Sequence, residues 1–333
     1  KKEVSSLYFG GGTPSLMIRD LKEIIDCIKE YFIIKDGIGI ELHPDDIEES
    51  TLDLLKLAGV TMVSLGIQSF NDNCLSALGR KNTNFTEKLD LVNQANFDVV
   101  DVDLIFAIPN QTEDILLDDL EKAFSHGATQ ISTYPFIDFT FASNAYKPMA
   151  EKEKKKMLNS IVKYCNKIGK ERTAVWTFAK KHTGRYSSVT RDSFLGFGLS
   201  ATTLLRKEFK INTFSIEGYI KRIEQNQLPT SLTLSFTPRQ RAVYHLFWSA
   251  YSMKIDPENF QKLTGIPLKK IFGFEMWLAE KMRFIEKRSN IYYLTEKGAY
   301  YYHYLEQAYT TAYIDKMWNI SRTRAFPEKI VLK

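Results

Sequence analysis

Short apolar runs of the kind that form strands recur along the first 145 residues. They cover residues 6–9, 38–42, 62–67, 99–106 and 130–134. Their starts are spaced by roughly 30 residues, which is the length of a strand–helix–strand unit. The spacing therefore predicts strands that run parallel to one another and are connected through helices.

Between these runs, apolar residues recur at the three- and four-residue spacing of amphipathic helices. We expect helices over residues 21–32, 52–58 and 116–124, the second and third ending near Gly59 and Gly127. A charged stretch at 151–156 opens a further helix that closes near Gly169. Alternating strands and helices predict an α/β fold, either an open doubly wound sheet or a TIM-type (β/α) barrel.

Beyond about residue 235 this alternation stops and aromatic residues become dense. Two helical stretches are followed by a β-ribbon, 284–288 and 291–294, with a turn at Ser289 and Asn290. This pattern is typical of a small winged-helix unit, but it lacks a basic recognition helix, so nucleic-acid binding is not expected. We expect three parts: 1–145 as the core, 146–234 as an extension completing the substrate side, and 235–333 as a C-terminal domain.

Composition narrows the class of protein. The 333 residues are 44% hydrophobic and 26% charged, and no apolar run approaches the length of a membrane span. The net charge of +5 permits an anionic ligand without indicating a nucleic-acid binder. With no apolar signal sequence, a cytoplasmic location is expected. The chain opens on Lys1 and reaches its first apolar run almost at once, from which we expect it to be cut from something longer.

The three cysteines, Cys27, Cys74 and Cys165, lie far apart. Their number and spacing fit neither a disulfide framework nor a metal-binding cluster. They are expected to be ordinary thiols, and no metal ligands are assigned within the chain.

The stretch YFGGGTPS, residues 8–15, carries the most informative chemistry. A strand runs directly into three glycines, which let the backbone approach a ligand without obstruction by side chains. Free N–H groups near the start of a helix attract carboxylates or phosphates. Taken alone, the motif is explained equally well as a tight turn, since its spacing matches neither a Rossmann fingerprint nor a P-loop.

Polar motifs follow at the ends of the later strands. They are IELHPDD (40–46), SLGIQSF (64–70) with LGRK (78–81), DLIFAIPNQT (103–112) and STYPF (132–136). In α/β barrels the active site is built at these carboxyl ends. Glu41, Gln68 and Asp103 lie in or near these positions, where a carboxylate suits ribose hydroxyls and an amide suits a donor or an acceptor. The alternative for Glu41 and Asp103 is a solvated carboxylate at a strand end.

The order and spacing of these motifs resemble radical S-adenosylmethionine (SAM) enzymes related to oxygen-independent coproporphyrinogen III oxidase. The later WTFA (176–179) and FLGFG (194–198) resemble further segments of that family, so the resemblance spans essentially the whole chain. It implies a partial TIM-type barrel of the radical SAM kind, lacking its first strand, with a small winged-helix-like C-terminal domain.

The resemblance also implies a cofactor site for S-adenosylmethionine. Arg80 fits such a site because its guanidinium forms a fork with a carboxylate. Catalytic residues are not assigned. The residues expected to bind the cofactor are Gly10, Gly11, Gly12, Thr13, Glu41, Gln68, Arg80, Asp103, Tyr134 and Phe136.

A 4Fe-4S cluster is the second cofactor that the resemblance implies. In the family a Cys-x-x-x-Cys-x-x-Cys loop holds it, and these 333 residues contain no such loop. We expect the cluster cysteines upstream of Lys1, with a natural, cluster-free relative as the alternative.

Three functions remain open. The first is a radical SAM enzyme acting on a tetrapyrrole, by oxidative decarboxylation or a related heme-modifying reaction, with an electron donor such as flavodoxin or ferredoxin. The second is a heme-binding chaperone of the same family, and the third is a cluster-free interaction protein. Residues 185–198 depart from the oxidase pattern, so coproporphyrinogen is not assigned as the substrate. The aromatics Tyr134, Phe136, Phe139 and Trp176 suit stacking on a macrocycle, or packing in the core.

Overall fold

A computed structural model describes residues 1–140, 147–184 and 192–329. The described chain divides into two compact units. The first holds residues 1–136 and 147–184, and the second holds residues 137–140 and 192–329. The three-part division expected from the sequence stays a prediction.

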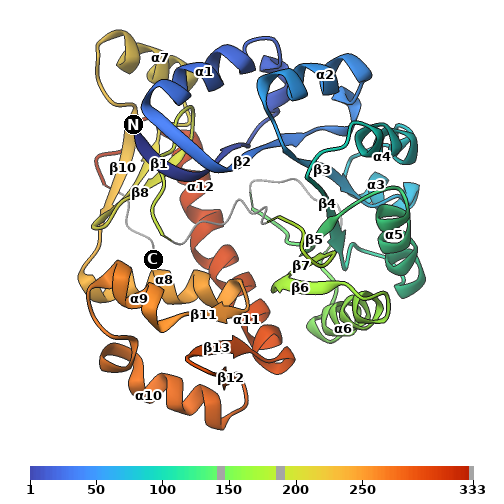
Figure 1. Ribbon diagram of the computed structural model, residues 1–333, viewed down its shortest axis with the longest axis vertical. Helices are drawn as coiled ribbons and strands as arrows, with labels where there is room; N and C mark the ends of the chain where they lie inside the picture. Colours follow the sequence, from blue (N-terminus) through green and yellow to red (C-terminus); the bar gives the residue numbers. More distant parts are fainter. Residues whose placement is uncertain (141–146, 185–191, 330–333) are drawn as a thin grey trace. The chain divides into compact units, whose positions relative to one another are not determined.

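The first unit is built on a curled seven-stranded sheet in the order β1-β2-β3-β4-β5-β7-β6. Its first five strands pair in parallel, as expected from the spacing of the apolar runs, and β7 and β6 continue the sheet antiparallel. Figure 1 shows the sheet with its helices on the outer side. The α/β half-barrel expected from the sequence is confirmed. The strands are β1 (Lys2–Phe9), β2 (Phe32–Leu42), β3 (Met62–Gln68), β4 (Val99–Phe106), β5 (Gln130–Pro135), β6 (Glu171–Ala174) and β7 (Thr177–Ala179).

The helices of this unit end where the sequence changes its backbone preference. Gly59, Gly127 and Gly169 have φ of 84°, 110° and 71°, a left-handed conformation that glycine adopts at little cost. Thr112 caps α5 by accepting from the backbone N–H of Ile115 at 3.3 Å. The helices are α1 (Leu21–Tyr31), α2 (Glu49–Ala58), α3 (Asp72–Ala77), α4 (Phe85–Gln94), α5 (Glu113–Ser125) and α6 (Glu151–Lys167), with short 3-10 turns η1 (Pro14–Met17) and η2 (Pro44–Asp46).

Several elements of this unit differ from the sequence prediction, and α3, β6 and β7 were not expected. Phe32 was expected in the first helix, yet it is extended and opens β2, because residues 32–34 pair with Lys2 to Val4 of β1. Helix α4 was not expected, although Phe85, Leu89 and Val92 follow helical spacing and form its buried face.

The core of the first unit lies between the sheet and these helices. Leu65 and Ile67 of β3 and Val102 and Leu104 of β4 are fully buried. Burying one such side chain contributes about 1.5–3 kcal/mol to folding. The central strands are therefore firmly held, and they support the polar residues at their carboxyl ends.

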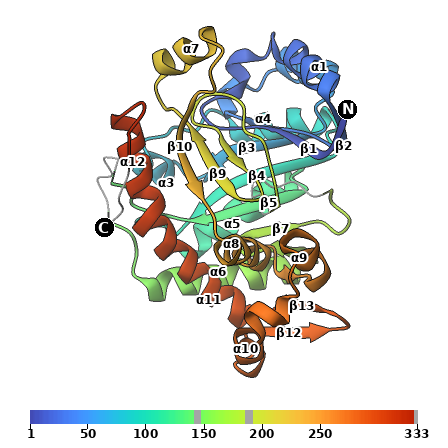
Figure 2. The ribbon, with the colours of Figure 1, turned by 90° about the vertical axis from the view of Figure 1, so that its left-hand side faces the viewer.

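The second unit opens with a three-stranded antiparallel sheet in the order β10-β9-β8, which Figure 2 shows with β9 and β10 side by side. Its strands are β8 (Thr202–Leu204), β9 (Glu208–Asn212) and β10 (Thr230–Ser235), with α7 (Ile216–Glu224) between the last two. The sequence prediction missed this sheet, because its strands are short and lack a sustained alternation.

The rest of the second unit is helical with a small ribbon, as expected for the C-terminal part. The ribbon pairs β11, β13 and β12 antiparallel, and Ser289 turns with φ of 54°. No helix in the part of the chain that the structure describes is both long and apolar enough to cross a membrane. The elements are α8 (Pro238–Tyr251), β11 (Lys254–Ile255), α9 (Pro257–Thr264), α10 (Leu268–Lys281), β12 (Ile285–Arg288), β13 (Ile291–Leu294), α11 (Glu296–Tyr309), a π-helical turn (Thr310–Ile314) and α12 (Asp315–Thr323).

Candidate functional site

The glycine-rich turn after β1 is open on one side. Gly11 and Gly12 have φ of 75° and 58°, and a Cβ built on either would meet no heavy atom within 4 Å. Gly10 differs, because a Cβ there would lie 2.4 Å from a ring carbon of Tyr8 and 2.9 Å from Oε1 of Glu41. The turn therefore packs tightly against Glu41 while leaving free space beside its next two residues.

Glu41 is fixed at the end of β2 by two donors from the chain before it. The backbone N–H of Gly11 donates to Oε2 at 2.9 Å, and the hydroxyl of Tyr8 donates to Oε1. One turn further, Ser15 Oγ donates to Asp46 Oδ2 at 2.5 Å, which ties η1 to η2. The first two strand ends thus form one hydrogen-bonded unit.

Gln68 and Arg80 gather around Gly66 at the end of β3. Arg80 Nη1 donates to the carbonyl of Gly66 at 2.7 Å, and a Cβ on that glycine would lie 3.2 Å from Gln68 Nε2. Burial lowers the pKa of Arg80, opposed by the negative charges of Asp45 and Asp103. An open pocket of about 460 Å³ adjoins this guanidinium, lined by Asp72, Ser76, Gly79, Arg80, Lys81 and Asn82.

Asp103 lies in β4 with a second carboxyl, Asp101, two residues before it. Side chains two apart on a strand point to the same face, and Ser64 of β3 contacts both. Burial raises the pKa of Asp101 to about 6, and burial together with the charge of Asp101 raises the pKa of Asp103 well above its usual value. Glu41 adds to that rise and Arg80 opposes it, so these residues share one electrostatic environment.

The aromatic residues proposed from the sequence do not form one group. Tyr134 meets Trp176 edge to face at 5.8 Å between ring centroids. Phe136 and Trp176 are each only 4% exposed, which is the burial of core residues. Phe139 belongs to the second unit, where it stacks on Trp318 at 6.5 Å.

Sequence reasoning named Glu41, Gln68 and Asp103 and missed the residues that hold them. Tyr8, Ser64 and Asp101 each bond a proposed site residue or its partner. A signal for Asp101 was present, because strand periodicity places it on the same face as Asp103.

The strand-end residues fit S-adenosylmethionine. The turn after β1 exposes its backbone, and the following strand ends carry carboxylates suited to the cofactor's ammonium and ribose hydroxyls and an amide suited to its polar groups. The guanidinium of Arg80, from the segment after α3, contacts Gly66 of β3 and suits a carboxylate. The described residues do not fit a 4Fe-4S cluster, since no three His, Cys, Asp or Glu side chains among them are arranged to hold a metal ion. Cys27, Cys74 and Cys165 lie on α1, α3 and α6.

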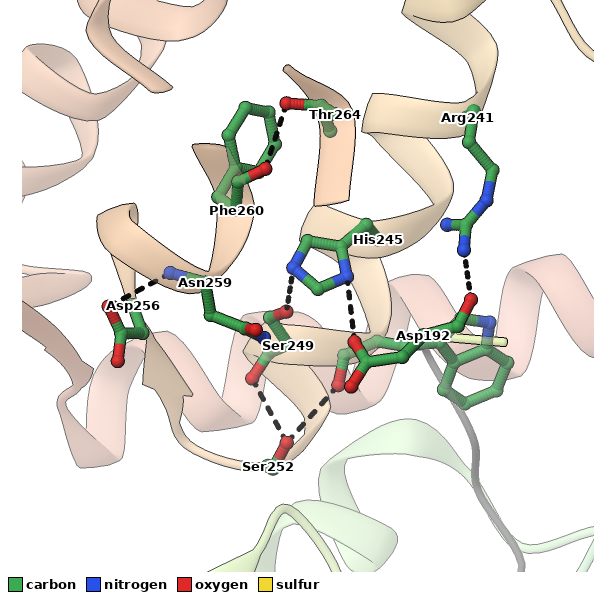
Figure 3. A network of polar contacts seen from close by, with 10 residues as sticks. Asp192, Arg241, His245, Ser249, Ser252, Asp256, Asn259, Phe260 and Thr264 are labelled. Carbon is green, nitrogen blue, oxygen red and sulfur yellow. Dashed lines mark hydrogen bonds and ion pairs between the residues drawn. The ribbon is translucent and has the colours of Figure 1, made fainter. Parts of the chain in front are cut away.

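A second polar cluster lies in the second unit, and Figure 3 shows it. Nδ1 of His245 lies 3.4 Å from Asp192 Oδ1, and Nε2 lies 3.4 Å from Ser249 Oγ. Arg241 donates to the carbonyl of Asp192. The order Ser–His–Asp resembles a hydrolase triad, but Ser249 is only 5% exposed and His245 only 1%. We assign the cluster a structural role, in which it anchors Asp192 to α8.

Comparison with known proteins gives this arrangement a family context. Residues 1–123 match the sequence profile of the radical SAM superfamily. The chain is 26% identical over 317 residues to the heme chaperone HemW of Bacillus subtilis, covering 89% of this chain and 83% of that protein. It is 23% identical over 255 residues to the oxygen-independent coproporphyrinogen III oxidase of Synechocystis, covering 69% of this chain and 55% of the oxidase.

The fold agrees with a solved relative. Coproporphyrinogen III oxidase (HemN) from Escherichia coli, described as a radical SAM enzyme, superposes with a TM-score of 0.75 at 18% identity, covering 90% of this chain and 76% of HemN. Radical SAM proteins bind S-adenosylmethionine and a 4Fe-4S cluster.

Proposed function

We propose that this chain binds S-adenosylmethionine at the carboxyl ends of β1 to β5. The premise is that it carries a radical SAM domain and is related to HemW heme chaperones and oxygen-independent coproporphyrinogen III oxidases. We propose further that the protein acts on a tetrapyrrole. The observation that carries the first part is the hydrogen bond from Gly11 to Glu41, which holds the open glycine turn against an acidic strand end.

Each side chain has a role in this proposal. Gly11, Gly12 and Thr13 leave backbone groups open to the methionyl part of the cofactor. Glu41 and Asp103 supply carboxylates for its ammonium and ribose hydroxyls. Gln68 at the end of β3, and Arg80 from the segment after α3, orient its remaining polar groups. Tyr134 lies half-buried near the end of β5. We place its ring on the side of the sheet that faces the cofactor.

S-adenosylmethionine, when bound, supplies a sulfonium whose cleavage yields a methyl group or a deoxyadenosyl group for reaction. Because the described residues do not fit an iron–sulfur cluster, no step through one is derived from them. The contribution of this chain is to position the cofactor at the strand ends. For the reaction we propose oxidative decarboxylation or a related modification of a tetrapyrrole side chain.

A second candidate is heme delivery without turnover. It is favoured by the alignment with B. subtilis HemW, which extends over 83% of that protein, whereas the alignment with the Synechocystis oxidase covers 55% of the oxidase. The two candidates share the cofactor site and differ in what happens to the tetrapyrrole.

An anaerobic assay of the full-length protein with S-adenosylmethionine, a reductant and a tetrapyrrole separates them. Deoxyadenosine released in step with an altered porphyrin supports an enzyme. Stoichiometric heme binding with no altered porphyrin supports delivery. A protein that binds neither S-adenosylmethionine nor a tetrapyrrole would overturn the proposal.

A further inference from the structure

A row of polar side chains crosses the sheet beneath the cofactor residues. Strand register pairs Glu41 of β2 with Ser64 of β3, Ser64 with Asp101 of β4, and Asp101 with Gln130 of β5. Asp103 lies two residues further along β4, in register with Ser132. Because strand side chains alternate between faces, the two carboxyls of β4 lie on the same face.

The hydrogen bonds of this row leave one proton unassigned. Ser64 Oγ lies 3.3 Å from Asp101 Oδ2 and 3.1 Å from Asp103 Oδ2. A serine hydroxyl has a single hydrogen and donates to one carboxylate at a time. If both carboxyls were ionised, one of the two close oxygen pairs would have no hydrogen between its atoms, which is costly at a buried site.

Asp101 has the better supply of donors. Ser132 Oγ lies 3.1 and 3.0 Å from its two carboxyl oxygens, and Gln130 adds a further hydrogen bond. The whole row is satisfied when Asp103 carries a proton and donates it to Ser64, whose hydroxyl then donates to an ionised Asp101. This places one proton on the pair, held at the carboxyl nearer to the strand end.

The surrounding charges agree with that placement. The negative charges of Asp101, on the same strand, and Glu41, on β2, disfavour a charge on Asp103. The positive charge of Arg80, from the segment after α3, favours it. Its hydrogen-bond partner Ser64 of β3 and its register partner Ser132 of β5 are uncharged. Burial and the negative neighbours therefore raise the pKa of Asp103 against the effect of one guanidinium, and a further cation beside it would favour its ionised form.

We propose that Asp101 is a positioning residue of the S-adenosylmethionine site, which acts through Ser64 on Asp103, and that binding of the cofactor displaces one proton from this carboxyl pair to solvent. The inference rests on the proposed function. The cofactor carries a sulfonium and an ammonium, and a cation beside Asp103 stabilises its ionised form. Binding and proton release are then linked, so affinity rises with pH.

Calorimetric titration of the protein with S-adenosylmethionine between pH 5.5 and 7.0, in buffers of different ionisation enthalpy, measures the number of protons released. This window lies below the titration of the cofactor's own amino group. We expect release of up to about one proton per cofactor and a dissociation constant that tightens with rising pH, by up to about tenfold per pH unit. In D101N the charge of Asp101 no longer adds to burial in raising the pKa of Asp103, and we expect the affinity to depend less steeply on pH than in the unmodified protein.

Glu306→Gln is the control, because Glu306 is a buried carboxyl of the second unit whose pKa is raised to about 7. It titrates near the same range, and its removal should leave the proton count unchanged. An infrared band of a protonated carboxyl at pH 5.5, present without cofactor and reduced in D103N, checks the pair independently of binding.

The outcomes separate this inference from the proposed function. Cofactor binding without proton release, or the same pH slope in D101N as in the unmodified protein, would overturn the inference and leave the cofactor site standing. Absence of cofactor binding at every pH would overturn the cofactor site and this inference with it.

Discussion

Gly11 donates its backbone N–H to the carboxylate of Glu41 at 2.9 Å, which joins the turn after β1 to the end of β2. The two residues lie 30 positions apart in sequence and meet because β1 and β2 are parallel neighbours. The glycine-rich turn and the acidic strand end are each weak evidence of a binding site, and this hydrogen bond places them side by side.

The glycine turn gives the first prediction. G11A should lower the free energy of unfolding by about 1–2 kcal/mol, because alanine is strained at a left-handed φ. The added methyl meets no protein atom, so any further effect must come from a ligand. We expect weaker S-adenosylmethionine binding, measured by equilibrium dialysis.

Gly169→Ala is the matched control, because Gly169 has φ of 71° and the same open surroundings at the end of α6. It should show the same loss of stability with unchanged affinity. Equal affinities for the two variants would contradict the placement of the cofactor at Gly11.

Glu41 gives the second prediction. E41Q keeps the shape of the side chain and removes its charge, and hydrogen bonds to charged groups are worth about 1.5–3 kcal/mol. The affinity for S-adenosylmethionine should therefore fall tenfold or more. Glu30→Gln, an exposed residue of α1, should have no effect on binding. Unchanged binding by E41Q would remove Glu41 from the site.

Asp119 gives a prediction about stability. It is 1% exposed and accepts from Ser69 Oγ and from the backbone N–H of Phe70, each at 2.7 Å, which holds the chain that follows Gln68 against α5. D119A leaves both donors buried without this acceptor, and we expect a loss of about 2–4 kcal/mol. Thermal unfolding measures it.

Asp118→Ala supplies the comparison on the same helix. Asp118 is exposed and pairs with Lys122 at 2.7 Å, a contact worth less than about 1 kcal/mol. If D118A and D119A destabilised the protein equally, the assigned role of Asp119 would be wrong.

Glu306 gives a prediction about pH. Burial raises its pKa from 4.5 to about 7, so the unfolded chain releases this proton at lower pH than the folded chain does. The contribution to stability is complete below about pH 4.5 and falls as pH rises to about 7. E306Q lacks this loss and should be more stable than the unmodified protein at pH 8 by about 1–3 kcal/mol.

Denaturant titrations at pH 5 and pH 8 test the sign. The exposed Glu224→Gln should behave as the unmodified protein at both pH values. If E306Q lost as much stability between pH 5 and pH 8 as the unmodified protein does, the assignment of this pH dependence to Glu306 would be wrong.

Much of the first unit was predictable, because its signals are local. The apolar run at 99–106 became β4 with the same bounds, and Gly59 and Gly127 ended helices as expected. Phe32 was assigned to the wrong element, since its strand conformation depends on pairing with β1. The antiparallel sheet of 202–235 was missed because its strands are short and are stabilised by contacts distant in sequence.

The strand-end positions of the proposed site residues were predictable from the sequence, whereas the residues that support them were not. Glu41, Gln68 and Asp103 follow from the rule that parallel strands present their carboxyl ends together. The bonds of Tyr8 to Glu41 and of Ser64 to two carboxyls depend on strand register, which spacing alone does not specify. Residues 185–191, within the segment that departs from the oxidase pattern, lie outside the described residues.

The central claim is that the strand ends around Glu41 and the glycine turn bind S-adenosylmethionine. Equilibrium dialysis with radiolabelled cofactor, run side by side on the unmodified protein, G11A, G169A and E41Q, tests it most directly. The account predicts saturable binding by the unmodified protein and G169A, and binding at least tenfold weaker in G11A and E41Q. No saturable binding by the unmodified protein, or equal binding by all four, would contradict it.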